Sequence, residues 1–135
     1  MNPPPTGQPQ PKPQPATVLL AHGSRDPTWQ QPLLRVQQRM AELAPGHPVV
    51  LAFLEMSPPS LPQAVADLVA AGANPITVVP LFLGMGKHAR EDLPQLAQQV
   101  RQAHPDLDLR VQSSVGEAPE LIEVLAHLAL GGTRP

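Results

Sequence analysis

The chain has 135 residues, enough for one domain with a single hydrophobic core. Its net charge of −2 excludes the basic surface of a nucleic-acid-binding domain, and the lack of cysteine excludes disulfides, thiolate zinc sites and iron–sulfur clusters. No apolar run reaches the roughly 18 residues of a membrane span, and the first residues do not form the apolar stretch of a signal peptide. We therefore expect a cytoplasmic protein without nucleic-acid or membrane partners.

Proline is concentrated at the start of the chain, where residues 1–15 contain seven of the 20 prolines. Residues 1–16 show no apolar periodicity and predict a disordered, polyproline-like tail. Such a segment can dock to a proline-binding module, but a passive extension is the commoner case. Residues 131–135 predict a second short tail. One folded domain is therefore expected over residues 17–130.

Four short apolar runs predict the strands of this domain. They cover residues 17–21, 49–54 and 76–81, followed by a weaker candidate at 107–112. The first three are nearly continuous in apolar residues rather than alternating. That pattern is typical of strands buried on both faces, as in a parallel sheet covered by helices.

Amphipathic segments follow each strand and predict helices at residues 28–43, 60–71, 89–103 and 119–130. The alternation of strand and helix predicts an α/β fold with a four-stranded parallel sheet and helices on both faces. By analogy with flavodoxin-like sheets, we expect the strand order 2-1-3-4. Ligands of such folds bind beyond the carboxyl ends of the strands, here between the first and third.

Three side chains with metal-binding groups follow the first three strands. His22, Glu55 and His88 each come just after a strand, one strand–helix unit apart. Neighbouring strands lie about 4.8 Å apart, so the three side chains can converge. Two imidazoles and a carboxylate suit Co²⁺, Fe²⁺, Ni²⁺ or Zn²⁺ and leave coordination positions open. A single loop histidine is more often bonded to backbone, but two of them beside glycine at the expected ligand site favour a functional role.

The segments around these residues resemble the short, class II sirohydrochlorin chelatases. The matching motifs are Ala-His-Gly-Ser-Arg-Asp at 21–26, Phe-Leu-Glu at 53–55, and Pro-Leu-Phe-Leu-Gly-Met-Gly-Lys-His-Ala-Arg-Glu-Asp-Leu-Pro at 80–94. Gly116, Glu117 and Pro119 resemble the last loop of that family. The likeness extends over about residues 17–130 and implies a chelatase-like three-layer sandwich.

The same resemblance implies insertion of Co²⁺ or Fe²⁺, or alternatively Ni²⁺, into sirohydrochlorin in cobalamin or sirohaem biosynthesis. It implies no ATP and no cofactor beyond the substrate metal ion. His22, His88 and Glu55 would then be both the metal ligands and the catalytic residues. Long members of the family hold two such units in one chain, so a homodimer that encloses the substrate is implied here.

Insertion must remove two pyrrole protons, and an imidazole or Glu55 can accept them as a general base, with Glu91 as a further candidate. Sirohydrochlorin carries carboxylates on its rim, which basic and hydroxyl side chains near the histidines can bind. Glycine in the same loops would let the backbone approach the flat ring. The residues predicted to bind the substrate are Ser24, Arg25, Gly84, Met85, Gly86, Lys87 and Arg90.

Two other functions remain open at this point. His-Gly-Ser-Arg after a strand is similar to the start of histidine phosphatases, but Ala21 stands where those enzymes have an arginine. A carrier of metal or tetrapyrrole could use the same two histidines without catalysing insertion. For His47, His104 and His127 we expect structural or solvent-exposed roles.

Overall fold

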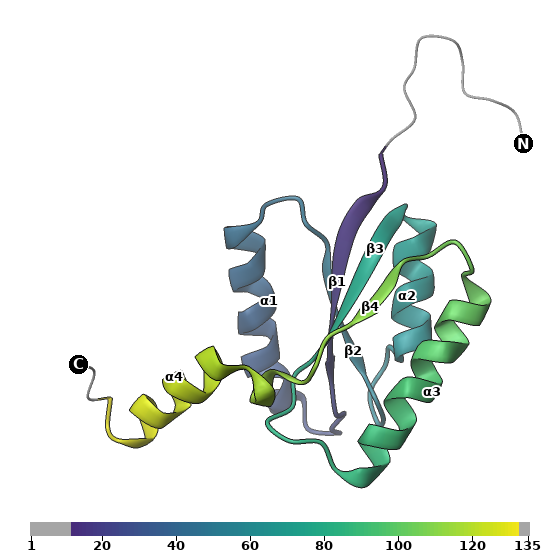
Figure 1. Cartoon of the computed structure of the whole chain (residues 1–135). Helices are drawn as coiled ribbons and strands as arrows, with labels where there is room; N and C mark the ends of the chain where they lie inside the picture. Colours follow the sequence, from purple (N-terminus) through teal and green to yellow (C-terminus); the bar gives the residue numbers. More distant parts are fainter. Residues whose placement is uncertain (1–11, 133–135) are drawn as a thin grey trace, which may run out of the picture.

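A computed structural model describes residues 12–132 of the chain (Figure 1). Four parallel strands form one sheet: β1 (Gln14–Ala21), β2 (Val49–Phe53), β3 (Ala73–Pro80) and β4 (Leu109–Val111). Their order is β2-β1-β3-β4. The predicted sheet and its strand order are therefore confirmed.

β1 begins earlier than the sequence predicts. Gln14 pairs with Ala73 and Ala16 with Ile76, and the register shifts between these two pairs, around Pro15. A proline cannot donate to the ladder, and an irregularity in the pairing is where a strand tolerates one. Residues 14–16, predicted as part of the tail, therefore belong to the sheet. The rest of that tail up to residue 11, and residues 133–135, lie outside the described residues.

The helices follow the predicted amphipathic segments. They are α1 (Gln31–Leu43), α2 (Leu61–Ala70), α3 (Lys87–Ala103) and α4 (Pro119–Ala129), with 3-10 turns η1 (Pro27–Gln30) and η2 (Val115–Glu117). Side chains cap two of these elements: Asp26 accepts a bond from the Thr28 amide at the start of η1, and Ser60 accepts one from Gln63 at the start of α2. No helix among the described residues is long and apolar enough to cross a membrane.

The main core lies between the sheet and the pair α2 and α3. On this face Val18, Leu20, Ile76 and Val78 are fully buried. They pack in one cluster with apolar side chains of both helices, namely Leu61, Ala64, Val65, Leu68, Leu93, Ala97 and Val100. Aliphatic side chains dominate, in keeping with an aromatic content of 2%.

The opposite face of the sheet is covered less completely. α1 lies over the β2 half, where the Gln37 amide donates a 2.7 Å bond to the carbonyl of Val49 and Trp29 contacts Phe53 at a ring distance of 6.2 Å. Figure 1 shows α4 running away from the sheet instead of lying beside α1. The predicted third layer is thus present as α1 alone, because α4 does not pack on its own sheet.

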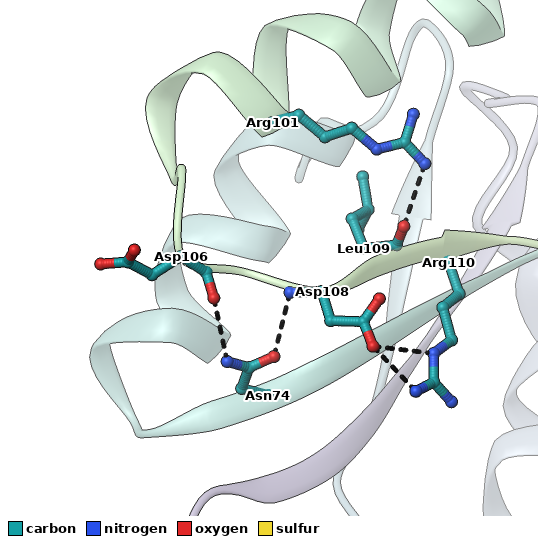
Figure 2. Close-up of polar contacts among 6 residues, drawn as sticks. All are labelled: Asn74, Arg101, Asp106, Asp108, Leu109 and Arg110. Carbon is teal, nitrogen blue, oxygen red and sulfur yellow. Dashed lines mark hydrogen bonds and ion pairs between the residues drawn. The ribbon is translucent and has the colours of Figure 1, made fainter.

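Polar contacts hold β4 at the amino end of the sheet (Figure 2). The side chain of Asn74 donates to the carbonyl of Asp106 and accepts from the amide of Asp108, so that it bridges the start of β3 to the segment before β4. Arg101 near the end of α3 donates a 2.9 Å bond to the carbonyl of Leu109. This short strand is therefore held by side chains as well as by its pairing with β3.

Candidate metal-transfer site

The loops that carry the predicted site residues meet at the carboxyl edge of the sheet. Pairing continues past the strand ends, since the amide of Leu54 donates to the carbonyl of Ala21 at 2.9 Å and that of Leu81 to Leu20 at 2.8 Å. The loops after β1, β2 and β3 therefore leave the sheet side by side, as parallel strands require.

His22, Glu55 and His88 line one cavity of about 90 Å³, together with Leu54, Ala89 and Asp92. The structure thus brings together the three residues that the sequence singled out. His22 follows β1 directly, Glu55 lies in the loop after β2, and His88 is the second residue of α3. All three side chains are exposed at the mouth of the cavity.

The three side chains surround the cavity without forming a finished coordination site. Within residues 12–132, no group of three or more histidine, aspartate or glutamate side chains is placed to hold a metal ion as it stands. These three side chains around the cavity are open to solvent.

Phe82 supports the ring of His22. The two rings lie 4.5 Å apart between centroids with a tilt of 41°, and Phe82 itself is buried. An aromatic contact of this kind favours particular ring orientations. Phe82 follows β3, so the neighbouring strand fixes the position of a side chain at the end of β1.

The loops after β1 and β2 are joined by backbone and hydroxyl contacts. A Cβ atom at Gly23 would lie 1.5 Å from the carbonyl oxygen of Glu55, so only glycine fits there. The Ser57 hydroxyl accepts from the amide of Ser24 at 3.3 Å and donates to the Ser24 carbonyl at 2.8 Å. This pairing, the Ser24–Ser57 clasp, holds the His22 loop against the Glu55 loop.

A second close backbone contact joins the last loop to the loop after β3. A Cβ atom at Gly116 would meet the carbonyl oxygen of Leu83 at 1.8 Å, and the Gly116 amide donates to the carbonyl of Phe82 at 2.9 Å. The loop between β4 and α4 is therefore held beside the segment that leads to His88.

Asp92 belongs to the cavity, although the sequence analysis did not select it. It lies four residues after His88 on α3, and residues at this spacing share one face of a helix. Glu91, the predicted further proton acceptor, is not among the lining residues. Both acids lie within one turn of His88, at three and four residues, so the helical spacing alone does not distinguish them.

The predicted substrate-binding residues spread over the loops around the cavity. Met85 and Arg90 line a different and larger cavity of about 340 Å³ between α3 and β4. Ser24 is half-buried in the clasp described above. The other predicted residues are exposed on the loops, namely Arg25, Gly84, Gly86 and Lys87.

Two polar side chains, one beside the site and one away from it, have structural partners. The Thr28 hydroxyl and the Thr28 amide both donate hydrogen bonds to the Asp26 carboxylate, and these bonds, the hydroxyl's first, lower the pKa of Asp26. The Asp26 side chain therefore caps η1 beside the His22 loop. Away from the site, the ring of His47 bonds to the Thr17 hydroxyl at 2.8 Å, in agreement with the structural role expected for that histidine.

Comparison with known proteins identifies the family. The family model described as CbiX matches residues 16–129, which is nearly all of the described chain. The chain belongs to the CbiX family. A sirohydrochlorin cobaltochelatase of Methanothermobacter thermautotrophicus is 36% identical over 85 residues, which are 63% of this chain and 59% of that protein. The chain covers 57–62% of the first four curated relatives, less than two thirds of their length.

Solved structures of similar proteins share the whole fold. A putative cobalamin biosynthesis CbiX protein from Marinobacter aquaeolei superposes with a TM-score of 0.75 at 28% identity, over 87% of this chain and 95% of that one. The sirohydrochlorin chelatase SirB from Bacillus subtilis subspecies spizizenii, in complex with cobalt, gives 0.72 at 25% identity, over 87% of this chain and 50% of SirB. The CbiX chain thus corresponds to about half of SirB.

Proposed function

We propose that this CbiX protein inserts a divalent metal ion, Co²⁺ or Fe²⁺ or alternatively Ni²⁺, into sirohydrochlorin without ATP. The observation that carries the proposal is that His22, Glu55 and His88 line a single cavity at the carboxyl edge of the sheet. These donor types suit borderline divalent ions. The choice of sirohydrochlorin as substrate rests on relatives named sirohydrochlorin cobaltochelatase. This substrate implies a role in cobalamin or sirohaem biosynthesis.

The size of the cavity limits what can enter it. About 90 Å³ has room for an ion and a few waters, since one water takes about 30 Å³ in the liquid. Pockets for drug-sized ligands measure about 300–1,000 Å³, so the macrocycle cannot enter. The ring therefore lies across the mouth of the cavity, with the ion below it and between the two imidazoles.

Metal insertion then requires two proton transfers away from the ring. An imidazole binds an ion through a deprotonated nitrogen, so His22 and His88 act as ligands in their neutral form. Glu55 and Asp92 are carboxylates at the same cavity and accept the two pyrrole protons as the ion moves into the ring. Asp92 thus takes the role of proton acceptor that was predicted for Glu91, which does not line the cavity.

Exposed cations near the cavity suit the carboxylates on the rim of the ring. Arg25 and Lys87 stand on the loops that carry His22 and His88, and a guanidinium can bind a carboxylate through two parallel bonds. Gly84 and Gly86 have open space around them, so the backbone there can approach a flat ligand. Ser24, Met85 and Arg90 complete the proposed substrate surface.

A ring lying across an exposed mouth has its second face uncovered. We therefore propose that two copies of the chain form a homodimer and enclose the substrate between them. SirB supports this arrangement, since one copy of this chain matches 50% of it. Action in the cytoplasm, and the lack of nucleic-acid and membrane partners and of a further cofactor, remain predictions.

The deciding experiment is a spectrophotometric insertion assay with sirohydrochlorin and Co²⁺, Fe²⁺ or Ni²⁺. His88→Ala removes one of the two imidazole ligands and should lower the insertion rate by at least about a hundredfold, since even the residues that only orient metal ligands contribute roughly 10–100-fold. His104→Ala, at the opposite end of α3, is the matched control and should keep the wild-type rate. Wild-type turnover by His88→Ala would overturn the site assignment. Tight metal binding by the wild type without insertion would instead support the carrier function.

A further inference from the structure

The loop after β2 holds Met56 in a strained backbone conformation. Its φ of 66° is the only positive value of a non-glycine residue within residues 12–132. The amide of Ser57 donates to the carbonyl of Glu55 at 2.8 Å, which closes a three-residue γ-turn around Met56. A bulky side chain disfavours this geometry, which glycine or asparagine adopts more readily. A methionine at this position therefore destabilises the folded chain.

The Met56 side chain does not offset this strain by packing within the described part of the chain. It is 66% exposed and belongs neither to the core nor to the side chains packed against it. Met56 follows Glu55, which lines the cavity, so the Cα atoms of the two residues lie about 3.8 Å apart. A large apolar side chain that strains the backbone and stays in solvent beside a cavity indicates a contact with a ligand.

Leu83 presents a second exposed apolar side chain on the opposite flank of the cavity. It is 69% exposed and directly follows Phe82, whose ring supports His22. Met85, two residues later, packs in part against the core. Because β2 and β3 lie on either side of β1, the loops that carry Met56 and Leu83 leave the sheet two strand spacings apart, about 10 Å.

Both exposed residues stand on backbone that a close glycine contact holds in place. A Cβ atom at Gly23 would lie 1.5 Å from the carbonyl oxygen of Glu55, the acceptor in the turn around Met56. On the other flank, the atoms nearest to a Cβ at Gly116 belong to the backbone of Leu83. The two side chains are thus presented on fixed backbone, and little loop ordering is needed when a ligand binds.

We propose that Met56 and Leu83 form a preformed apolar platform, the Met56–Leu83 platform, for the flat body of the tetrapyrrole. This inference rests on the proposed function and names side chains that would bind its substrate. The loop of His22 leaves the sheet between the two residues, so a ring that rests on both lies over the cavity. Cations on the loops bind the carboxylates of the rim, and the platform binds the ring itself.

Titration with metal-free sirohydrochlorin, followed by the absorbance of the ring, tests the platform. Met56→Gly removes the side chain and suits the turn, so the free energy of unfolding in urea should stay equal or rise. The Kd for the ring should rise about tenfold, as expected for the loss of one buried apolar contact. Leu83→Ala should weaken binding to a similar extent. Leu43→Ala removes a side chain of 68% exposure at the far end of α1, and this matched control should keep the wild-type Kd.

Opposite responses of stability and affinity in Met56→Gly distinguish the platform from a structural role, which would lower both together. A loss of stability in Met56→Gly would overturn the proposal, and so would a wild-type Kd in that variant or in Leu83→Ala. If the wild type binds the ring and inserts metal while these variants bind equally well, the platform alone is refuted. A wild type that does not bind the ring would refute the proposed function together with the platform.

Discussion

Val78 and Val79 are neighbours on β3 and carry the same side chain, yet one is fully buried and the other half-buried. The difference follows the two faces of the sheet. Under α2 and α3 the β3 side chains of Ile76 and Val78 are fully buried in the apolar core, whereas on the α1 side α4 runs away from the sheet (Figure 1). Identical side chains in one strand therefore contribute unequally to the free energy of unfolding, because they are buried to different extents.

The largest difference in stability is expected between substitutions at two glycines, Gly23 in close backbone contact and Gly84 in open space. Gly23→Ala forces a methyl group onto the Glu55 carbonyl, and overpacking of this kind costs about 1–3 kcal/mol or more. Gly84→Ala meets nothing within 4 Å and should change the free energy of unfolding by less than about 1 kcal/mol. Urea denaturation of both variants measures the difference. Equal stability would show that the two loops are not in fixed contact.

The two valines sharpen the comparison between the faces. Val78→Ala removes fully buried methyl groups and should lower the free energy of unfolding by about 2 kcal/mol, the transfer contribution plus a cavity. Val79→Ala should cost less than about half of that, because its side chain is already partly exposed to water. Urea denaturation curves of the two variants provide this measurement, and equal costs would show that the two faces of β3 are packed alike.

Removing the Ser24–Ser57 clasp should have the smallest effect on the free energy of unfolding. Ser57→Ala removes both bonds of one hydroxyl and should cost about 1 kcal/mol of stability, typical of a partly buried hydrogen bond. Ser57→Thr keeps the hydroxyl and is the conservative control. Insertion kinetics complete the comparison, since a loosened Glu55 loop should lower kcat. A decrease in stability with kcat unchanged would limit the clasp to a structural role.

Much of the architecture followed from the pattern of apolar residues. Continuous apolar runs predicted the strands of a parallel sheet, although only β1 is buried on both faces, and strand–helix alternation with the order 2-1-3-4 brought His22, Glu55 and His88 to one edge. Each of those steps uses a strong regularity of parallel α/β sheets. The grouping of three distant side chains could therefore be predicted from the sequence.

Other structural features could not be predicted from the pattern of apolar residues along the chain. Residues 14–16 join the sheet through backbone pairing, which needs no apolar side chains and so left no signal. The amphipathic stripe of α4 predicted a helix but not the surface that covers it. Asp92 and Glu91 both lie within one helical turn of His88, and only the packing of the loops decides which of them lines the cavity.

The brevity of β4 has a consequence for how copies of this protein can meet. An exposed strand at the border of a sheet offers unpaired amides and carbonyls to any neighbour, and long flat borders invite stacking into fibres. Here the border strand has three residues and carries the Arg110–Asp108 ion pair at its start. Endless strand-by-strand growth is thereby discouraged at this border, because a strand of three residues offers few unpaired amides and carbonyls to a neighbouring chain.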